Sequence, residues 1–231
     1  MKFAKVALAA AAAILAAPAS AMLVLQGTEP IGGTGLGAVS TLLTLQSPAN
    51  TGDATGSVSF DGTTDVVSGN TTALNSTFTF ASLGIESAAE IGIVFNASEP
   101  GNDAQVNLDG LSLTVFSTSG ATLFTSGAVS CGDLNPDCSL TNTFQGTGNS
   151  GFLFTLDTVQ QDALTAAVGQ NTFGNLRLGL NATVSNATGG NETFFVTDVM
   201  APIPEPETYA LMMAGLGAIG FMARRRKQKQ S

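Results

Sequence analysis

The chain has 231 residues, with 17 acidic and 8 basic side chains, and it contains no histidine and no tryptophan. The absence of histidine excludes Ser-His-Asp and Cys-His catalytic arrangements and imidazole metal ligands. Binding nucleic acid requires lysine and arginine to neutralise the phosphates, and the chain has few of them, so we also expect no nucleic-acid partner.

Residues 1–21 have the order of a secretory signal. Lys2 and Lys5 precede an unbroken apolar run over residues 6–17, and Ala19-Ser20-Ala21 follows a proline. This pattern predicts a signal peptide at 1–21 that the Sec translocon recognises, with cleavage after Ala21. The alternative is an uncleaved anchor helix, but the apolar run is short for a membrane span.

Residues 22–201 form the predicted exported domain, and their charge is strongly negative. Only Glu205 and Glu207 among the acids lie outside this range, and Arg177 is its one base, which gives a net charge near −14. Such a surface repels nucleic acid and anionic lipid and attracts cations. We expect Arg177 to face water beside a carboxylate, and the alternative is that it anchors a ligand.

Apolar residues alternate with polar ones through most of this domain. The pattern occurs at 74–80, 91–95, 111–115, 152–156 and 176–184, and turn-forming clusters separate these segments. Alternation is typical of half-buried strands. Many short strands of this kind predict an all-β fold, an antiparallel β-sandwich that is jelly-roll-like.

One segment has helical spacing instead. Val159, Ala163 and Ala167 recur in Asp157 to Val168, with Asp157 as a candidate N-cap and Gly169 as the stop. We predict one short helix there, packed across an end or edge of the sandwich.

Cys131 and Cys138 enclose the short polar loop GDLNPD. In an oxidising compartment, this spacing predicts a structural disulfide, and the alternative is a reduced pair with a redox role. Within the loop, Asp133, Asn135 and Asp137 alternate as oxygen ligands for calcium would. The alternative is a solvated turn, so calcium is a candidate cofactor only. Glu99, Asn102, Asp103 and Asp109 form a second acidic loop.

The sequence favours a protein that is not an enzyme. Phenylalanines 60, 78, 80, 95 and 154 occupy core-facing strand positions rather than a sugar-stacking surface. Carboxylate pairs for glycoside hydrolysis remain an alternative, since acids are plentiful. The N-x-[ST] sequons at Asn70, Asn75, Asn96, Asn181, Asn186 and Asn191 indicate surface polarity.

Residues 202–231 form a separate tail. Tyr209 to Ala223 carries no charge and is followed by Arg224, Arg225, Arg226 and Lys227. We predict a transmembrane helix at about 207–223 and a basic tail at 224–229. The basic cluster would keep the C-terminus cytoplasmic while the acidic domain lies outside.

Pro204-Glu205-Pro206, Thr208-Tyr209, a glycine-bearing apolar helix and a run of arginines occur in order in this tail. With its motif at 204–209, the tail resembles the PEP-CTERM sorting signal of Gram-negative bacteria. The segment NATGGNETFFVTDVMAPIPEPETYA resembles the junction at which a last strand runs almost directly into such a signal.

The resemblance implies a single-pass stage in the inner membrane and processing by an exosortase, a membrane-embedded transpeptidase. The final location would be the cell surface or the extracellular space. Proteins of this kind commonly come from bacteria that make exopolysaccharide and biofilm. We therefore expect a non-catalytic surface or matrix protein associated with exopolysaccharide, and the alternative is a calcium-assisted glycan-binding module.

Overall fold

The computed structural model describes residues 22–29, 39–48, 52–72, 74–97, 105–133, 135–141, 151–169, 171–187 and 190–199. The chain divides into two compact units, Met1–Val199 and Met200–Ser231, and every described residue belongs to the first. The predicted signal peptide and sorting tail lie outside the described residues. Within the described part of the chain, no helix is long and apolar enough to cross a membrane.

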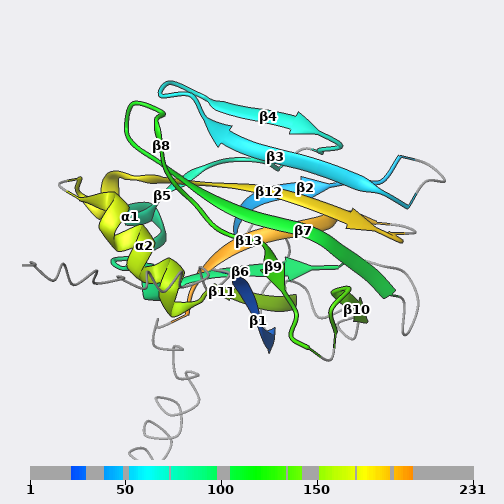
Figure 1. The fold of residues 1–231 in the computed structure, drawn as a ribbon. Coiled ribbons are helices and arrows are strands. Elements are labelled where there is room, and N and C mark those ends of the chain that lie inside the picture. Colours follow the sequence, from blue (N-terminus) through cyan, green and yellow to red (C-terminus); the bar gives the residue numbers. More distant parts are fainter. Residues whose placement is uncertain are drawn as a thin grey trace, which may run out of the picture. The chain divides into compact units, whose positions relative to one another are not determined.

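The first of two sheets has six strands in the order β2–β13–β6–β11–β1–β9 (Figure 1). Neighbouring strands are antiparallel except for the short pairing of β1 with β9. The strands are β1 (Leu23–Glu29), β2 (Ser40–Leu45), β6 (Ile91–Asn96), β9 (Val129–Ser130), β11 (Gly151–Leu156) and β13 (Glu192–Asp198).

The second sheet has seven strands. Its main path is β10–β7–β12–β3–β4, with β5 beside β12 and β8 beside β7. All of these pairings are antiparallel. The strands are β3 (Ala54–Phe60), β4 (Asp65–Gly69), β5 (Phe78–Thr79), β7 (Gln105–Phe116), β8 (Thr122–Thr125), β10 (Ser139–Thr141) and β12 (Arg177–Ser185).

The chain crosses repeatedly between the two sheets. It passes from β2 to β3, from β6 to β7, and from β11 through β12 to β13, changing sheet each time. As a result, strands from late in the chain lie between strands from early in the chain, as in the two Greek keys of a jelly roll. This occurs in the orders β2–β13–β6–β11 and β10–β7–β12–β3. The prediction of an all-β sandwich is confirmed, and this strand order agrees with jelly-roll-like wrapping.

The core lies between the sheets and follows the alternation in the sequence. In β12, Leu178, Leu180 and Val184 are buried while Asn181 is exposed. Phe95 and Phe194 stack with ring centroids 4.7 Å apart. Phenylalanines 60, 80, 95 and 154 are buried as predicted, and Phe78 is half-buried. Removing these apolar faces from water is the main contribution to the stability of the fold.

Segment 74–80 differs from its prediction. Only Phe78–Thr79 forms a strand, and it leads into a one-turn helix, α1 (Phe80–Leu83). The side chain of Thr79 accepts a hydrogen bond from the amide of Ser82, so it caps this helix instead of continuing a strand. The prediction of one short helix was therefore incomplete, because α1 and the 3-10 turns η2 (Ala88–Glu90) and η3 (Phe173–Asn175) accompany the predicted one.

The predicted helix itself is confirmed as α2 (Thr158–Val168), with Asp157 as its N-cap. Its buried face differs from the one that the Val159 spacing indicates. Gln160, Leu164 and Val168 are buried, whereas Val159 is 48% exposed. The helix is rotated so that this face is buried, because the larger Leu164 fills the core and the amide oxygen of Gln160 accepts a hydrogen bond from the Gly127 N–H at 2.7 Å.

Candidate functional site

The loop between β9 and β10 is closed by the predicted disulfide. Cys131 and Cys138 are bonded, with their Cα atoms 5.2 Å apart. The side chain of Asn135 accepts from the Ser139 N–H and donates to the Ser139 carbonyl, both at 3.0 Å. These bonds tie the loop to the start of β10, so Asn135 has a structural role in holding it.

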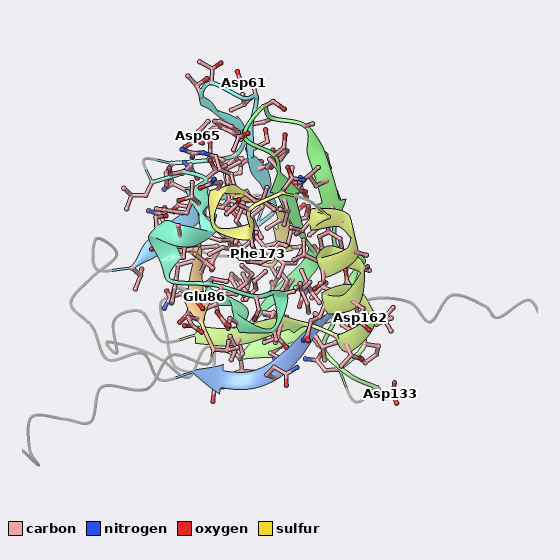
Figure 2. All side chains as sticks on the ribbon, turned by 90° about the vertical axis from the view of Figure 1, so that its left-hand side faces the viewer. Asp61, Asp65, Glu86, Asp133, Asp162 and Phe173 are labelled. Atoms are coloured by element: carbon pink, nitrogen blue, oxygen red, sulfur yellow. A yellow bond between two sulfur atoms is a disulfide. The ribbon has the colours of Figure 1, made fainter. Side chains whose placement is uncertain are left out.

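The three predicted calcium ligands occupy different positions in this loop. Asp133 lies at its outer tip, away from the body of the sandwich (Figure 2). The amide of Asn135 is engaged with Ser139, and Asp137 lines a pocket beside β7. Among the described residues, no three His, Cys, Asp or Glu side chains gather as a metal site. Calcium binding at Asp133, Asn135 and Asp137 stays a prediction.

The pocket beside this loop has a volume of about 560 Å³. Asp109 and Asp137 both line it, and Asp109, predicted as part of the second acidic loop, lies within strand β7. The other predicted members of the second loop, at 99, 102 and 103, lie outside the described residues. The pocket is lined by Asn107, Leu108, Asp109, Val129, Pro136, Asp137, Cys138 and Ser139.

Arg177 is held at the start of β12 by several groups. Its guanidinium lies 3.7 Å from Asp65 and donates to the hydroxyl of Thr77 at 2.8 Å. The same group sits over the ring of Phe60, 4.5 Å from the centroid. The predicted carboxylate neighbour is therefore present. Sequence reasoning missed Phe60 and Thr77, because strand pairing brings them to Arg177 from elsewhere in the chain.

Two sequon asparagines accept backbone hydrogen bonds from neighbouring strands. Asn70 accepts the backbone N–H of Thr55 at 3.2 Å, and Asn75 accepts that of Thr44 at 2.8 Å. Both side chains therefore satisfy backbone groups of β3 and β2. The sequence did not predict these two contacts, because they depend on which strand each asparagine comes to lie beside.

Two carboxyl groups have perturbed acidity. The backbone N–H groups of Thr64 and Thr63 hold the pKa of Asp61 below its ordinary value, because they donate to the ionised form in the β3–β4 turn. The backbone N–H of Glu86, and then the Ser87 hydroxyl, lower the pKa of Glu90 before β6. Both carboxylates organise turns.

The described fold and the predicted tail together define a class: an all-β sandwich joined to a C-terminal sorting segment. The PEP-CTERM protein-sorting motif matches residues 202–227, so the chain is a protein with a PEP-CTERM sorting domain. This match spans the predicted motif Pro204, Glu205, Pro206, Thr208 and Tyr209 and the basic cluster Arg224, Arg225, Arg226 and Lys227. It indicates a secreted protein that is targeted by an exosortase.

Only residues 199–201 separate the end of β13 from the matched motif, as the sequence predicts. No curated protein and no solved structure matches the chain.

Proposed function

We propose that this protein is a non-catalytic component of the cell surface or extracellular matrix, associated with exopolysaccharide. It enters the Sec translocon through residues 1–21 and is held in the inner membrane by the tail. An exosortase then processes it near Pro204-Glu205-Pro206. The sorting motif at 202–227 carries this proposal, because it indicates a secreted protein that an exosortase targets.

The exported domain fits such a role. Its net charge near −14 keeps it soluble outside the cell and attracts the cations of a hydrated matrix. Its large aromatic faces, such as Phe95 and Phe154, pack in the core and stabilise the sandwich. A disulfide at Cys131–Cys138 suits an oxidising location.

The first test is the C-terminus of the protein recovered from its host, measured by mass spectrometry. We expect it near residues 204–208, without the arginines. Glu205→Ala should leave the tail attached, and the neighbouring Glu207→Ala serves as the matched control. An intact Ser231 in the unaltered chain would mean permanent anchoring and would exclude the matrix role.

Calcium-assisted glycan binding is the second candidate. The pocket that contains both Asp109 and Asp137 favours it, because carboxylate oxygens are ligands that calcium prefers. Thermal unfolding with calcium and then with chelator tests the first step. We expect a higher midpoint with calcium, and Asp137→Asn should remove the increase while Asp162→Asn on α2 retains it. An unchanged midpoint rules the candidate out.

A further inference from the structure

Strand β4 forms an outer edge of the second sheet that differs from the other edges. The free side of β2 is covered by residues 70–72 and 74–76, through bonds such as Thr72 N–H to Thr44 C=O and Ser76 N–H to Leu42 C=O. The outer strand β8 packs against α2. The edge strands β9 and β10 have only two and three residues.

The backbone of β4 has hydrogen-bonding groups that point away from β3. At the β3–β4 turn, the N–H of Asp61 donates to the C=O of Thr64. At the other end of the β3–β4 ladder, the N–H of Asn70 donates to the C=O of Thr55. Bonded and non-bonded pairs alternate along an antiparallel ladder. Every second residue of β4 therefore bonds to β3, and the residues between them point their backbone groups outward. The outward groups are the N–H and C=O of Asp65 and Val67 and the N–H of Gly69.

Within the described part of the chain, β4 pairs only with β3, and its side chains leave its other side open. Val66 and Val67 are 45% and 42% exposed, and the strand contains no lysine and no proline, the residues that commonly protect an edge. The only carboxylate on the strand, Asp65, accepts a hydrogen bond from the Thr77 N–H and lies beside Arg177. The edge therefore carries little unbalanced charge on a strongly acidic domain.

We propose that β4 pairs with β4 of a second copy of this chain, antiparallel and about a two-fold axis at Val67. In this register Val67 faces Val67 of the other copy, and Asp65 faces Gly69. A two-fold pairing thus keeps the two Asp65 carboxylates apart, and main-chain bonds join the second sheets of the two copies. The pairing extends the proposed surface role, but it is tested independently of processing.

Proline at position 67 tests the pairing without disturbing the fold. The Val67 N–H is not used by β3, so Val67→Pro should retain the melting temperature, whereas Val66→Pro should lower it by breaking the β3 ladder. Sedimentation of the full chain in detergent should show a dimer. Val67→Pro should raise the dissociation constant of this dimer by roughly tenfold. The conservative Val67→Thr should still dimerise, because it keeps the outward N–H.

Crosslinking identifies the occupant of the edge. Val67→Cys in the full chain should form a disulfide-linked homodimer on oxidation, and Val159→Cys on α2, at a slightly more exposed position, should not. Added salt should strengthen the dimer by screening the repulsion between acidic domains. A monomer at all concentrations, equal dimerisation of Val67→Pro, or capture of another protein by the Val67→Cys variant would overturn the proposal.

A second observation, at the start of β1, is independent of this edge. The backbone N–H of Met22 donates to Oδ2 of Asp157 at 2.7 Å, and Oδ1 of the same carboxylate accepts from the Gln160 N–H at 2.8 Å. Asp157 therefore joins the start of β1 to the N-terminus of α2. Met22 is also the residue that follows the predicted cleavage site.

We infer that signal removal strengthens this junction. Hydrolysis of the Ala21–Met22 bond adds water, leaving a carboxylate on Ala21 and a protonated amine on Met22. That ammonium is already within hydrogen-bond distance of Asp157, so a neutral bond becomes a charged one, which is stronger. Removal of the signal peptide would thereby let the new N-terminus form a charged hydrogen bond with Asp157, the N-cap of α2.

The test compares the protein from which the signal has been removed with the precursor that Ala19→Phe retains, both with the C-terminal tail attached and in detergent. Asp157→Asn should lower the melting temperature of the processed form by roughly 2–4 °C more than that of the precursor. N-terminal sequencing should find Met22. Equal effects of Asp157→Asn on the two forms, or an N-terminus at another residue, would overturn the inference.

Discussion

Arg177 is the single base of residues 22–201, and its surroundings explain why one is retained there. It joins Asp65 after the β3–β4 turn, Thr77 before β5 and the Phe60 ring, so it links three separate parts of the second sheet. Arginine suits this position because its planar group can donate several hydrogen bonds while it lies over an aromatic face.

Replacing Arg177 tests this role. Arg177→Gln should lower the free energy of unfolding by about 1–2 kcal/mol, discounted because both partners of the ion pair are partly exposed. Urea denaturation measures the change. Asn181→Gln, at an exposed position on the same strand, is the control and should alter stability by less than about 0.5 kcal/mol. Equal effects would show that the contacts of Arg177 contribute nothing.

Asp61 makes the β3–β4 turn sensitive to acid. Its folded pKa lies below its unfolded value of about 3.9, so its contribution is complete above that value and is lost as the pH falls through the lower folded pKa. NMR titration of the Asp61 carboxyl should show the lowered midpoint. Asp61→Asn keeps an acceptor for Thr63 and Thr64, and it should remove this part of the acid response. A midpoint at or above about 3.9 would contradict the assignment.

At the scale of elements, α2 shows how packing overrides an apolar spacing. Val159 and Leu164 are both apolar, yet only Leu164 enters the core, because the buried amide of Gln160 fixes the rotation of the helix through Gly127. A helical pattern with several small alanines permits more than one face to pack. The N-cap and the stop were predictable because they depend on neighbouring residues.

Two alanine substitutions separate the faces of α2. Leu164→Ala should cost about 2–5 kcal/mol through lost burial and a cavity, whereas Val159→Ala should be nearly neutral. Thermal or urea unfolding of the two variants gives the comparison. A larger loss from Val159→Ala than from Leu164→Ala would mean that the helix packs by the face that the sequence suggested.

At the scale of the whole molecule, the charges divide by location. The acidic residues concentrate in 22–201 and the bases in the last eight positions. We predict that changing Arg224, Arg225, Arg226 and Lys227 to Gln releases the C-terminus from the cytoplasmic side and reduces processing. Protease accessibility of a C-terminal tag and the mass of the recovered protein measure this. Lys229→Gln alone is the control, and unchanged processing of the fourfold variant would refute the orientation.

The sequence by itself determined the class of fold, the disulfide, the α2 caps and the sorting motif. These properties depend on local pattern: alternation along a strand, residue spacing in a loop, or an ordered series of short signals. Tertiary structure decided the partners of Arg177, the buried face of α2, the pocket lined by Asp109 and Asp137, and the position of β4 at an edge of its sheet. Each of these depends on contacts between distant segments: the packing of α2 against the core, or the choice and register of paired strands. Many pairings are compatible with the same alternating pattern.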